Sequence, residues 1–365
     1  MRILLTGESL AGHLSPIIAV YDAIKSLKKE ANLESLEFML ITSKSHFLWE
    51  IFEETKIPYK TITISKRTNP FLALPFGIIA FFQALIHVFN FMPDIIFSKG
   101  GYVSVPVVFA GWIFRIPIIV HESDSVPSRM DKFMFRFAEK VAISFNESKD
   151  LYNSSKVFFT GNPVRNFIFR KNKEEAMESF SLSKEKPVIL VMGGSEGAEE
   201  INRLIIEVLP ELLKDYQIIH QCGVGNYDKV RSIVEKMNIY NLGGYHLFPF
   251  FKKRIADAYA ACDLITSRAG ANTVSEIMAV GKPSVLIPLA SAVSDKQKMN
   301  AFHYSEAGAA ILLGEKNLKP HLLLNVINDI FKDHLKIIEM QRAAKQLANP
   351  LAARKIAEEI IKTAK

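Results

Sequence analysis

The chain repeatedly passes from a short, uninterrupted apolar run into a turn and then into a segment whose apolar residues have helical spacing. Strands of a parallel sheet are apolar without alternation, because helices cover both faces of such a sheet. The same pattern restarts after the stretch VFFTGNPVRNF. The sequence therefore predicts an α/β protein made of two Rossmann-like, doubly wound domains.

The point at which the pattern restarts sets the expected domain boundary. A chain of 365 residues is also too long for one ordinary core. We expect an N-terminal domain over residues 1–162 and a C-terminal domain over residues 163–345. A final amphipathic helix, at about residues 346–365, is compatible with packing on either domain, including back on the first.

Individual strands and helices follow from the same pattern. The first helix is expected at residues 15–29, with Ser15 as its N-cap and Pro16 at its first position. The expected strands lie in RILLTG, FMLITS, IPYKTITI, DIIFSKGG, IPIIVHES and KVAISF, and after the restart in KPVILVMGG, YQIIHQCG, YHLFPF, DLITSRAG and KPSVLIPL.

Composition narrows the class of protein. A hydrophobic content of 49% is typical of a folded globular chain and argues against disorder. The net charge of +7 suits a nucleotide, a phospholipid surface or a nucleic acid, but it is spread along the chain and ranks these partners only weakly. The two cysteines, Cys222 and Cys262, the second in an expected apolar helix, indicate no disulfide framework and no zinc site. A reducing cytoplasm fits, and no signal peptide is expected.

One uncharged apolar segment, Phe71 to Phe89, allows three interpretations. Its length reaches the lower limit of a membrane span, about 17 to 25 residues. It could also be a helix buried against the sheet, or a helix whose outer face lies on a membrane. Lys66 and Arg67 precede it, and we favour the membrane surface for the region up to Phe91. Further basic residues at helical spacing support this choice: Arg129, Lys132, Arg136 and Lys140.

Four turns between expected strands and helices are rich in glycine: TGESLAGH, SKGGYVSVP, VMGGSEGAEEIN and TSRAGANTVSE. Ligands of open parallel sheets collect at such turns, where exposed amides at a helix start favour an anion. VMGGSEGAEEIN is the best candidate for a diphosphate, through Gly193, Gly194 and the hydroxyl of Ser195. It is neither a Walker loop nor a full dinucleotide fingerprint, which argues against a nicotinamide-dependent dehydrogenase.

Two further groups of polar residues follow expected strands. Glu276, in the helix after Arg268, is placed to accept hydrogen bonds from ribose hydroxyls. His121, Glu122 and Asp124 follow an apolar run and could line a substrate or ligate a metal, but their spacing matches no strong metal pattern.

Taken in order, these turns resemble the MurG family. The matching stretches are AGH with LSPIIAV, SKGGYVSVP, HESD, GNPVR, GGSEGAEEIN, SRAGANTVSE and DKQKMNA, which cover nearly the whole chain. Members of this family are membrane-associated transferases that add N-acetylglucosamine from UDP-N-acetylglucosamine to lipid I, forming lipid II in peptidoglycan synthesis.

The resemblance implies a GT-B glycosyltransferase architecture of two Rossmann-like domains facing a central cleft. The donor nucleotide is then expected mainly in the C-terminal domain and the undecaprenyl-diphosphate-linked acceptor mainly in the N-terminal one. The implied reaction is an inverting displacement with no cofactor and no obligatory metal. The implied partners are the UDP-sugar, the lipid acceptor, an anionic membrane surface at the cytoplasmic face and a cell-wall synthesis complex, with no nucleic acid.

The resemblance also assigns roles position by position. His13 corresponds to the general base, and an imidazole with a pKa near neutrality suits removal of a hydroxyl proton. Gln297 matches the residue that contacts the donor sugar, and Glu276 the one on the ribose. The full set is donor-binding Arg165, Ser195, Asn202, Arg268, Glu276 and Gln297, and acceptor-side Gly12, Tyr102, His121, Glu122 and Asp124.

The first glycine turn departs from the family pattern. Where the family has glycines and a threonine, this chain has Glu8, Ser9 and Leu10, and a second carboxylate, Glu196, stands in the diphosphate loop. A carboxylate close to a phosphate would weaken binding by about 1 to 4 kcal/mol, depending on the local dielectric constant. Two alternatives therefore stay open: a related transferase with another lipid acceptor, such as diacylglycerol, and a nucleotide-sugar-binding scaffold without catalysis.

Overall fold

The computed structural model divides the chain into two compact units. Unit 1 comprises Met1–Arg165 and Asn349–Lys365, and unit 2 comprises Asn166–Ala348. The first division thus falls after Arg165 rather than at residue 162. Each unit is described by itself. The structure describes residues 1–9, 11–28, 30, 34–45, 55–64, 70–152, 155–194, 197–237, 243–288, 294–314 and 318–364.

Unit 1 is built on a sheet of seven parallel strands in the order β3-β2-β1-β4-β5-β6-β7. The six strands expected in this half are confirmed, and the sheet gains β7, whose residues we had assigned to the boundary. The strands are β1 (Arg2–Thr6), β2 (Glu37–Thr42), β3 (Tyr59–Thr61), β4 (Ile95–Ser98), β5 (Ile118–Glu122), β6 (Lys140–Ile143) and β7 (Val157–Phe159).

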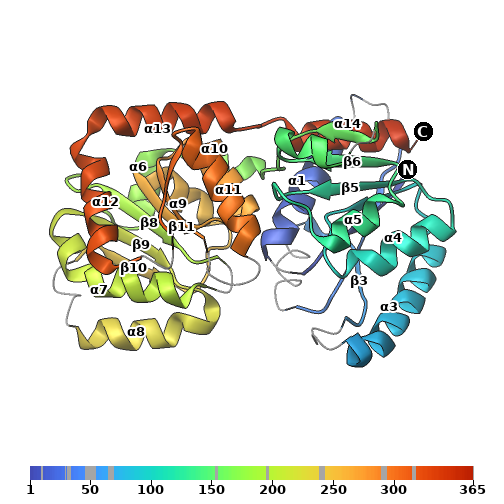
Figure 1. The fold of residues 1–365 in the computed structure, drawn as a ribbon, viewed down its shortest axis with the longest axis horizontal. Coiled ribbons are helices and arrows are strands. Elements are labelled where there is room, and N and C mark those ends of the chain that lie inside the picture. The colour runs from blue at the N-terminus through green and yellow to red at the C-terminus, as the bar shows by residue number, and fades with distance from the viewer. Residues whose placement is uncertain are drawn as a thin grey trace. The chain divides into compact units, whose positions relative to one another are not determined.

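Helices cover both faces of this sheet, so its strands are buried on both sides (Figure 1). Ile3 and Leu5 face a core that includes α1 and α14. Leu4, between them in β1, faces the opposite core with α3 and α4. This alternation explains why β1 reads as a continuous apolar run. The helices are α1 (Ala11–Leu27), α3 (Pro70–Phe91), α4 (Ser104–Ile113), α5 (Arg129–Phe135) and α14 (Ala352–Thr363), with 3-10 turns η1 (Asn146–Leu151) and η2 (Asn166–Phe169), the latter in unit 2.

Three expected helix boundaries are wrong. Helix α1 begins at Ala11, so Pro16 lies inside it, where it cannot donate the backbone hydrogen bond of that position. Helix α5 ends at Phe135, so Arg136 caps it and Lys140 begins β6, and the four basic residues do not share one helix. The final helix begins at Ala352, after α13 (His334–Leu347) ends. It packs on α1 within unit 1.

Unit 2 repeats the design with six parallel strands in the order β10-β9-β8-β11-β12-β13. All five strands expected in this half are confirmed, and β13 is additional. The strands are β8 (Val188–Met192), β9 (Gln217–Gln221), β10 (Tyr245–Phe248), β11 (Leu264–Arg268), β12 (Ser284–Ile287) and β13 (Ala310–Leu312). The helices are α6 (Lys173–Ser179), α7 (Glu199–Asp215), α8 (Tyr227–Lys236), α9 (Ile255–Ala261), α10 (Ala271–Val280), α11 (Ser294–Glu306), α12 (Pro320–Lys332) and α13, with η3 (Val224–Asn226).

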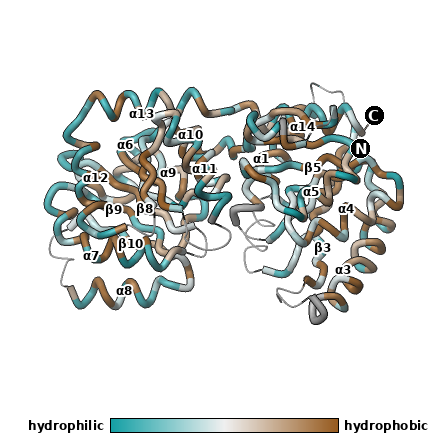
Figure 2. Tube along the Cα trace, viewed as in Figure 1, coloured by the Kyte–Doolittle hydropathy of each residue, from teal (hydrophilic) through white to brown (hydrophobic). Residues whose placement is uncertain are grey.

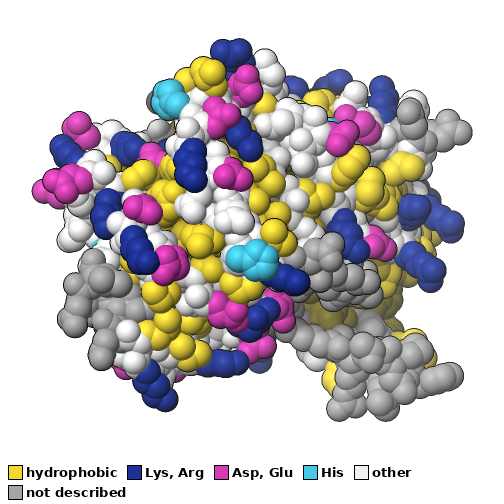
Figure 3. Space-filling view, turned by 60° about the vertical axis from the view of Figure 1, so that its left-hand side comes forward, with side chains coloured by type: hydrophobic (Ala, Val, Ile, Leu, Met, Phe, Trp, Pro, Cys, Tyr) yellow, Lys and Arg dark blue, Asp and Glu magenta, His cyan; other side chains and the backbone are white. Residues whose placement is uncertain are grey.

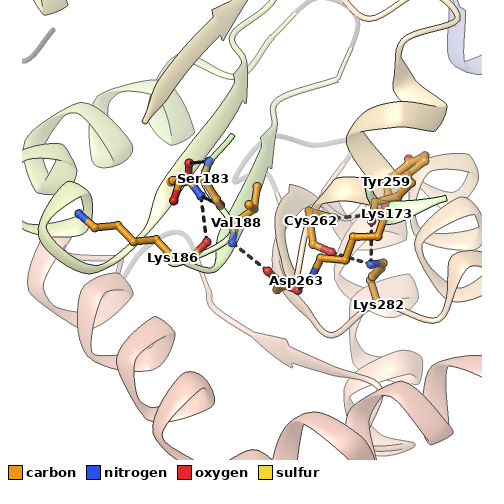
Figure 4. A network of polar contacts seen from close by, with 10 residues as sticks. Lys173, Ser183, Lys186, Val188, Tyr259, Cys262, Asp263 and Lys282 are labelled. Atoms are coloured by element: carbon orange, nitrogen blue, oxygen red, sulfur yellow. Dashed lines mark hydrogen bonds and ion pairs between the residues drawn. The ribbon is translucent and has the colours of Figure 1, made fainter. Parts of the chain in front are cut away.

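A polar network connects the amino ends of β8 and β11, which are the ends of these strands that lie away from the glycine turns (Figure 4). The Asp263 carboxylate accepts from the amide of Val188 at 2.9 Å and pairs with Lys173. Lys282 donates to the carbonyl of Cys262 at 2.6 Å. Cys262 follows the last residue of α9 rather than lying within the helix, and burial raises the pKa of its thiol to about 11. These contacts stabilise the fold, whereas ligands of open parallel sheets bind at the carboxyl ends of the strands.

Charged side chains do not gather by sign on the face shown in Figure 3, where basic and acidic groups are interspersed. Several form exposed pairs one helical turn apart, such as Arg203 with Glu207 and Arg231 with Glu235. Such pairs contribute at most about 0.5 kcal/mol each. This face therefore offers no single basic patch for a polyanion.

Candidate active site

The loop after β8 is a close turn that only glycine can form. A Cβ on Gly193 would lie 2.5 Å from the amide nitrogen of Ala198, and one on Gly197 would lie 2.2 Å from the carbonyl oxygen of Cys222. Gly194 and Gly197 have positive φ values of 87° and 83°. The loop leads into α7, so its amides lie at a helix start. Ser195 and Glu196 lie outside the described residues.

The end of the neighbouring strand β9 holds this loop through Gln221. Its Oε1 accepts from the amide of Phe251 at 2.9 Å, and its Nε2 donates to the carbonyl of Gly194 at 3.0 Å. Gln221 is 4% exposed. A buried amide that satisfies both partners fixes the loop in one position.

Asn202 turns its side chain into the same scaffold. Its Nδ2 donates to the carbonyl of Cys222 at 2.9 Å, so its Oδ1 is the acceptor toward His220 Nε2 at 3.0 Å. His220 Nε2 must then carry the proton, and Nδ1 accepts from the hydroxyl of Tyr245 at 2.9 Å. Complete burial lowers the pKa of His220 to about 3, so the ring is neutral. Asn202 thus acts within the protein, beneath the loop.

One of the expected donor residues contacts this loop, and another lies in the helix after the neighbouring strand β11. Arg268, at the end of β11, donates from Nη1 to the carbonyl of Gly197 at 3.3 Å. Glu276 lies in α10 and is 8% exposed, and its Oε2 accepts from the hydroxyl of Tyr259 at 3.0 Å. A carboxylate oriented by a tyrosine keeps its second oxygen in a defined direction.

The remaining donor candidates are placed as follows. Gln297 lies in α11 and is 8% exposed, next to the fully buried Asn300. Arg165 is half-buried and is the last residue of unit 1. Unit 2 therefore brings Asn202, Arg268 and Glu276 to the carboxyl ends of its strands.

In unit 1, Gly12 and His13 lie in the first turn of α1, at the carboxyl end of β1. Their side-chain surroundings lie outside the described part of the chain. Tyr102 stands before α4, its side chain 64% exposed, and its amide donates to Oε1 of Glu8 at 3.0 Å. The two glycine turns of this unit are therefore joined by Glu8.

His121, Glu122 and Asp124 lie at the end of β5, but they do not project together. His121 is 1% exposed, and its Nε2 lies 3.1 Å from Oγ of Ser144. Burial and the nearby Lys99 charge lower its pKa well below the ordinary value, so its ring is neutral. Glu122 accepts from the amide of Asp124 at 2.9 Å. Among the described residues, no group of three or more metal-ligating side chains could hold an ion.

Helix α3 is mostly apolar along its length, as its colour in Figure 2 shows, and many of its large apolar side chains are exposed. Ala80, Ala84 and Val88 are buried against unit 1, and only 17% of the window Leu74–Phe91 is buried. The interpretation as a fully buried helix is therefore wrong. Among the described residues it is the one helix long and apolar enough to cross a membrane, by length and composition alone. Lys66 and Arg67 lie outside the described residues. The exposed apolar residues are Leu74, Ile78, Ile79, Phe82, Ile86 and Phe89, with Trp112 and Phe133 on α4 and α5.

Sequence reasoning missed the residues that hold the site. Gln221 and His220 end the run YQIIHQCG, and Tyr259 lies in α9. A histidine and a glutamine that interrupt a buried apolar strand were the available signal, because buried polar groups need partners.

Comparison with known proteins agrees with this arrangement. The description "Glycosyltransferase family 28 N-terminal domain" matches residues 3–143, and "Glycosyltransferase family 28 C-terminal domain" matches residues 188–360. Among solved structures, the MurG of Acinetobacter baumannii is 25% identical with a TM-score of 0.71 and covers 99% of this chain and 100% of its own. The glycosyltransferase of kitacinnamycin, 14% identical with a TM-score of 0.72, covers 100% of this chain and 99% of its own and shows the fold alone.

The fold and these matches define a GT-B glycosyltransferase of family 28. A Bacillus cereus transferase is 36% identical over 92% of this chain and 94% of its own length. One from Lachnospira eligens is 35% identical over 94% and 95%. Both are named UDP-N-acetylglucosamine–N-acetylmuramyl-(pentapeptide) pyrophosphoryl-undecaprenol N-acetylglucosamine transferase. The chain belongs to the MurG family.

Proposed function

We propose that the protein transfers N-acetylglucosamine from UDP-N-acetylglucosamine to the 4-hydroxyl of the N-acetylmuramoyl-pentapeptide of lipid I, forming lipid II. The observation that carries the donor half is the glycine loop after β8, which Arg268 and Gln221 hold, together with Glu276 in α10, the helix after the neighbouring strand β11. The acceptor half rests on the family membership, because the relatives are named for that acceptor.

The donor is proposed to bind with its diphosphate at Gly194, the Ser195 hydroxyl and the start of α7, because the amides of Gly193 and Gly197 already donate to the carbonyls of Gln221 and Gly194. Glu276 accepts from the ribose hydroxyls, and Gln297 contacts the sugar. Arg268 adds a positive charge, and Arg165 is proposed to add a second. As UDP leaves, negative charge grows on the diphosphate, and preformed donors stabilise it. With these groups in place, the reaction as proposed requires no obligatory metal and no cofactor.

The acceptor hydroxyl is proposed to lose its proton to His13 as it attacks the anomeric carbon from the face opposite UDP, which inverts the configuration. Gly12 permits close approach, and Tyr102 presents an exposed ring beside the second turn. His121 and Glu122 are buried and hydrogen-bonded within unit 1, and the backbone amide of Asp124 donates to Glu122, so these residues are proposed to shape the acceptor turns. We assign them to positioning.

The enzyme is further proposed to lie peripherally on the cytoplasmic face of the membrane, through the exposed face of α3. Its aromatic neighbours widen that surface: Phe109 stacks on Trp112 with ring centroids 5.5 Å apart. Apolar area of this kind contributes about 25 cal/mol per Å² on leaving water. Membership of a cell-wall synthesis complex belongs to the same proposal.

A transfer assay tests the reaction. Purified protein in detergent receives labelled UDP-N-acetylglucosamine with lipid I or diacylglycerol as parallel acceptors. Transfer to lipid I alone is expected, with at least about a hundredfold loss in His13→Ala, the range of a general base. His321→Ala, which truncates an exposed histidine of α12, is the matched control. Transfer to diacylglycerol instead, or donor binding without any transfer, would replace the proposal by one of the two alternatives.

A further inference from the structure

Glu8 lies in a loop that is fixed on both sides of it. The carbonyl of Gly7 accepts from Oγ1 of Thr42 at 2.7 Å. On the other side, Oγ of Ser9 lies 2.8 Å from Oγ of Ser43, and Ser9 is 4% exposed. The backbone at Glu8 is therefore anchored to the end of β2, and its side chain points to the turn after β4.

That turn has two glycines, and the protein's own carboxylates occupy the space that they leave. Gly100 and Gly101 have φ values of 82° and 84°. A Cβ on Gly101 would lie 2.6 Å from Cγ of Glu8 and 2.9 Å from its Oε1, and one on Gly100 would lie 2.9 Å from Oδ1 of Asp131. In a phosphate-binding turn, missing Cβ atoms let a ligand approach the backbone. In this protein the side chain of Glu8 lies close to the backbone of Gly101 instead.

The amides of this turn are also engaged within the protein. The backbone amide of Lys99 donates to the carbonyl of Thr6 at 2.8 Å, and that of Gly100 donates to Oγ of Ser98 at 3.2 Å. The amide of Tyr102, at the approach to α4, donates to Glu8 at 3.0 Å. A carboxylate accepts from an amide as a phosphate oxygen does. Glu8 thus stands where an acceptor phosphate oxygen would otherwise be bound.

We infer that Glu8 is a specificity-determining residue that acts as a built-in anion: it keeps phosphate oxygens off the Tyr102 amide and weakens the hold on acceptors that carry a diphosphate. The acceptor part of this inference rests on the proposed function. Substrate and product carry the same diphosphate, so Glu8 loosens both. An effect on both states alike changes the acceptor KM and product release rather than the chemical step.

Inorganic pyrophosphate tests the anion claim without any transfer reaction. The amide resonance of Tyr102 is followed in the full-length protein during titration with pyrophosphate. We expect Glu8→Gly to bind about tenfold more tightly than the wild type, with the Tyr102 resonance shifting, because one close negative charge is removed. Glu8→Gln, which keeps an accepting oxygen without the charge, is expected between the two. Glu37→Gln is the matched control, because Glu37 is an exposed carboxylate at the amino end of β2, away from the glycine turns. This variant should leave the pyrophosphate affinity unchanged.

Acceptor kinetics complete the test. Glu8→Gly and Glu8→Gln should lower the KM for lipid I without raising kcat. Equal pyrophosphate affinity in all four proteins would overturn the inference, as would a raised acceptor KM in Glu8→Gln, since Glu8 would then only brace the turn. If the wild type transfers to no lipid, the proposed function fails, while the pyrophosphate titration still decides whether Glu8 excludes the anion.

Discussion

The variant Asn202→Ala distinguishes two roles for Asn202: direct contact with the donor, or support of the loop that binds the donor. The substitution removes two hydrogen bonds, from His220 Nε2 to Oδ1 at 3.0 Å and from Nδ2 to the carbonyl of Cys222 at 2.9 Å. The carbonyl of Cys222 still accepts from Nδ2 of the Asn226 side chain at 3.2 Å. The ring N–H of His220, a fully buried group, keeps no side-chain acceptor.

The cost follows from this asymmetry. A buried donor without a partner costs about 1–3 kcal/mol, and the lost bond to a carbonyl that retains another donor costs about 1 kcal/mol. We therefore expect the free energy of unfolding to fall by about 2–4 kcal/mol. Because Cys222 lies under Gly197, the loop loosens and the donor KM rises, by about tenfold if some 1.4 kcal/mol reaches the loop.

Urea unfolding, UDP calorimetry and hydrogen exchange over residues 193–198 measure these effects. Exchange in the nucleotide-free protein should be faster in Asn202→Ala. Asn325→Ala, an exposed amide of α12, should stay within about 0.5 kcal/mol of the wild type. A variant with unchanged stability and unchanged exchange but weaker UDP binding would refute the positioning role and return Asn202 to direct donor contact.

Four further outcomes are expected. Gln221→Glu should weaken UDP binding at least as much as Gln221→Ala, because its new oxygen would face the carbonyl of Gly194 at 3.0 Å; calorimetry measures it. Stability should fall by up to about 1.4 kcal/mol per pH unit as pH drops below about 6.5, because the unfolded chain protonates His220 and the folded chain, with its pKa of about 3, does not; urea unfolding of His220→Gln should show a flatter slope. Phe82→Glu, on the exposed face of α3, should reduce flotation with anionic vesicles, whereas Leu335→Glu on exposed α13 should not. Gly101→Ala should lower the melting temperature, since its Cβ would meet Glu8 at 2.6 Å in a left-handed turn; equal melting would refute the close contact.

Apolar runs predicted the two sheets well, because strands buried on both faces leave a signal that needs no knowledge of neighbours. The strands that escaped, β7 and β13, are three residues long, at an edge of each sheet. Edge strands carry a weaker apolar signal because fewer of their residues are buried. Helix starts were harder: Ser15 and Pro16 form a good local start signal, yet α1 begins at Ala11. Local sequence signals show where a helix is able to begin, but tertiary packing decides the residue at which it does begin.

The sequence predicted where polar residues lie relative to the sheet better than it predicted which groups they bind. Glu276 and Arg268 could be expected near a ligand because Arg268 ends β11 and Glu276 lies in the helix that follows. Asn202 lies in α7, after the glycine loop, but its partner is His220 in β9, 18 residues away, and a pairing between a helix and a strand so far apart in the chain has no local signature. The same holds for Glu8, whose partner amide is 94 residues away. Long-range hydrogen bonds decide whether a polar residue faces the ligand or the scaffold.

The contact of Glu8 changes what the first glycine turn implies. A carboxylate at a phosphate turn suggested two alternatives, a transferase with another lipid acceptor or a scaffold without catalysis. The structure shows an arrangement in which the carboxylate has a fixed amide partner and glycine at 101 is required by Glu8 itself. The two positions are therefore coupled: a glycine at position 8 would leave the amide of Tyr102 open, and a side chain at position 101 would displace Glu8. Acceptor affinity in this enzyme is then set by a pair of residues on different turns, and Glu8→Gly with Gly101→Ala should be non-additive in the acceptor KM.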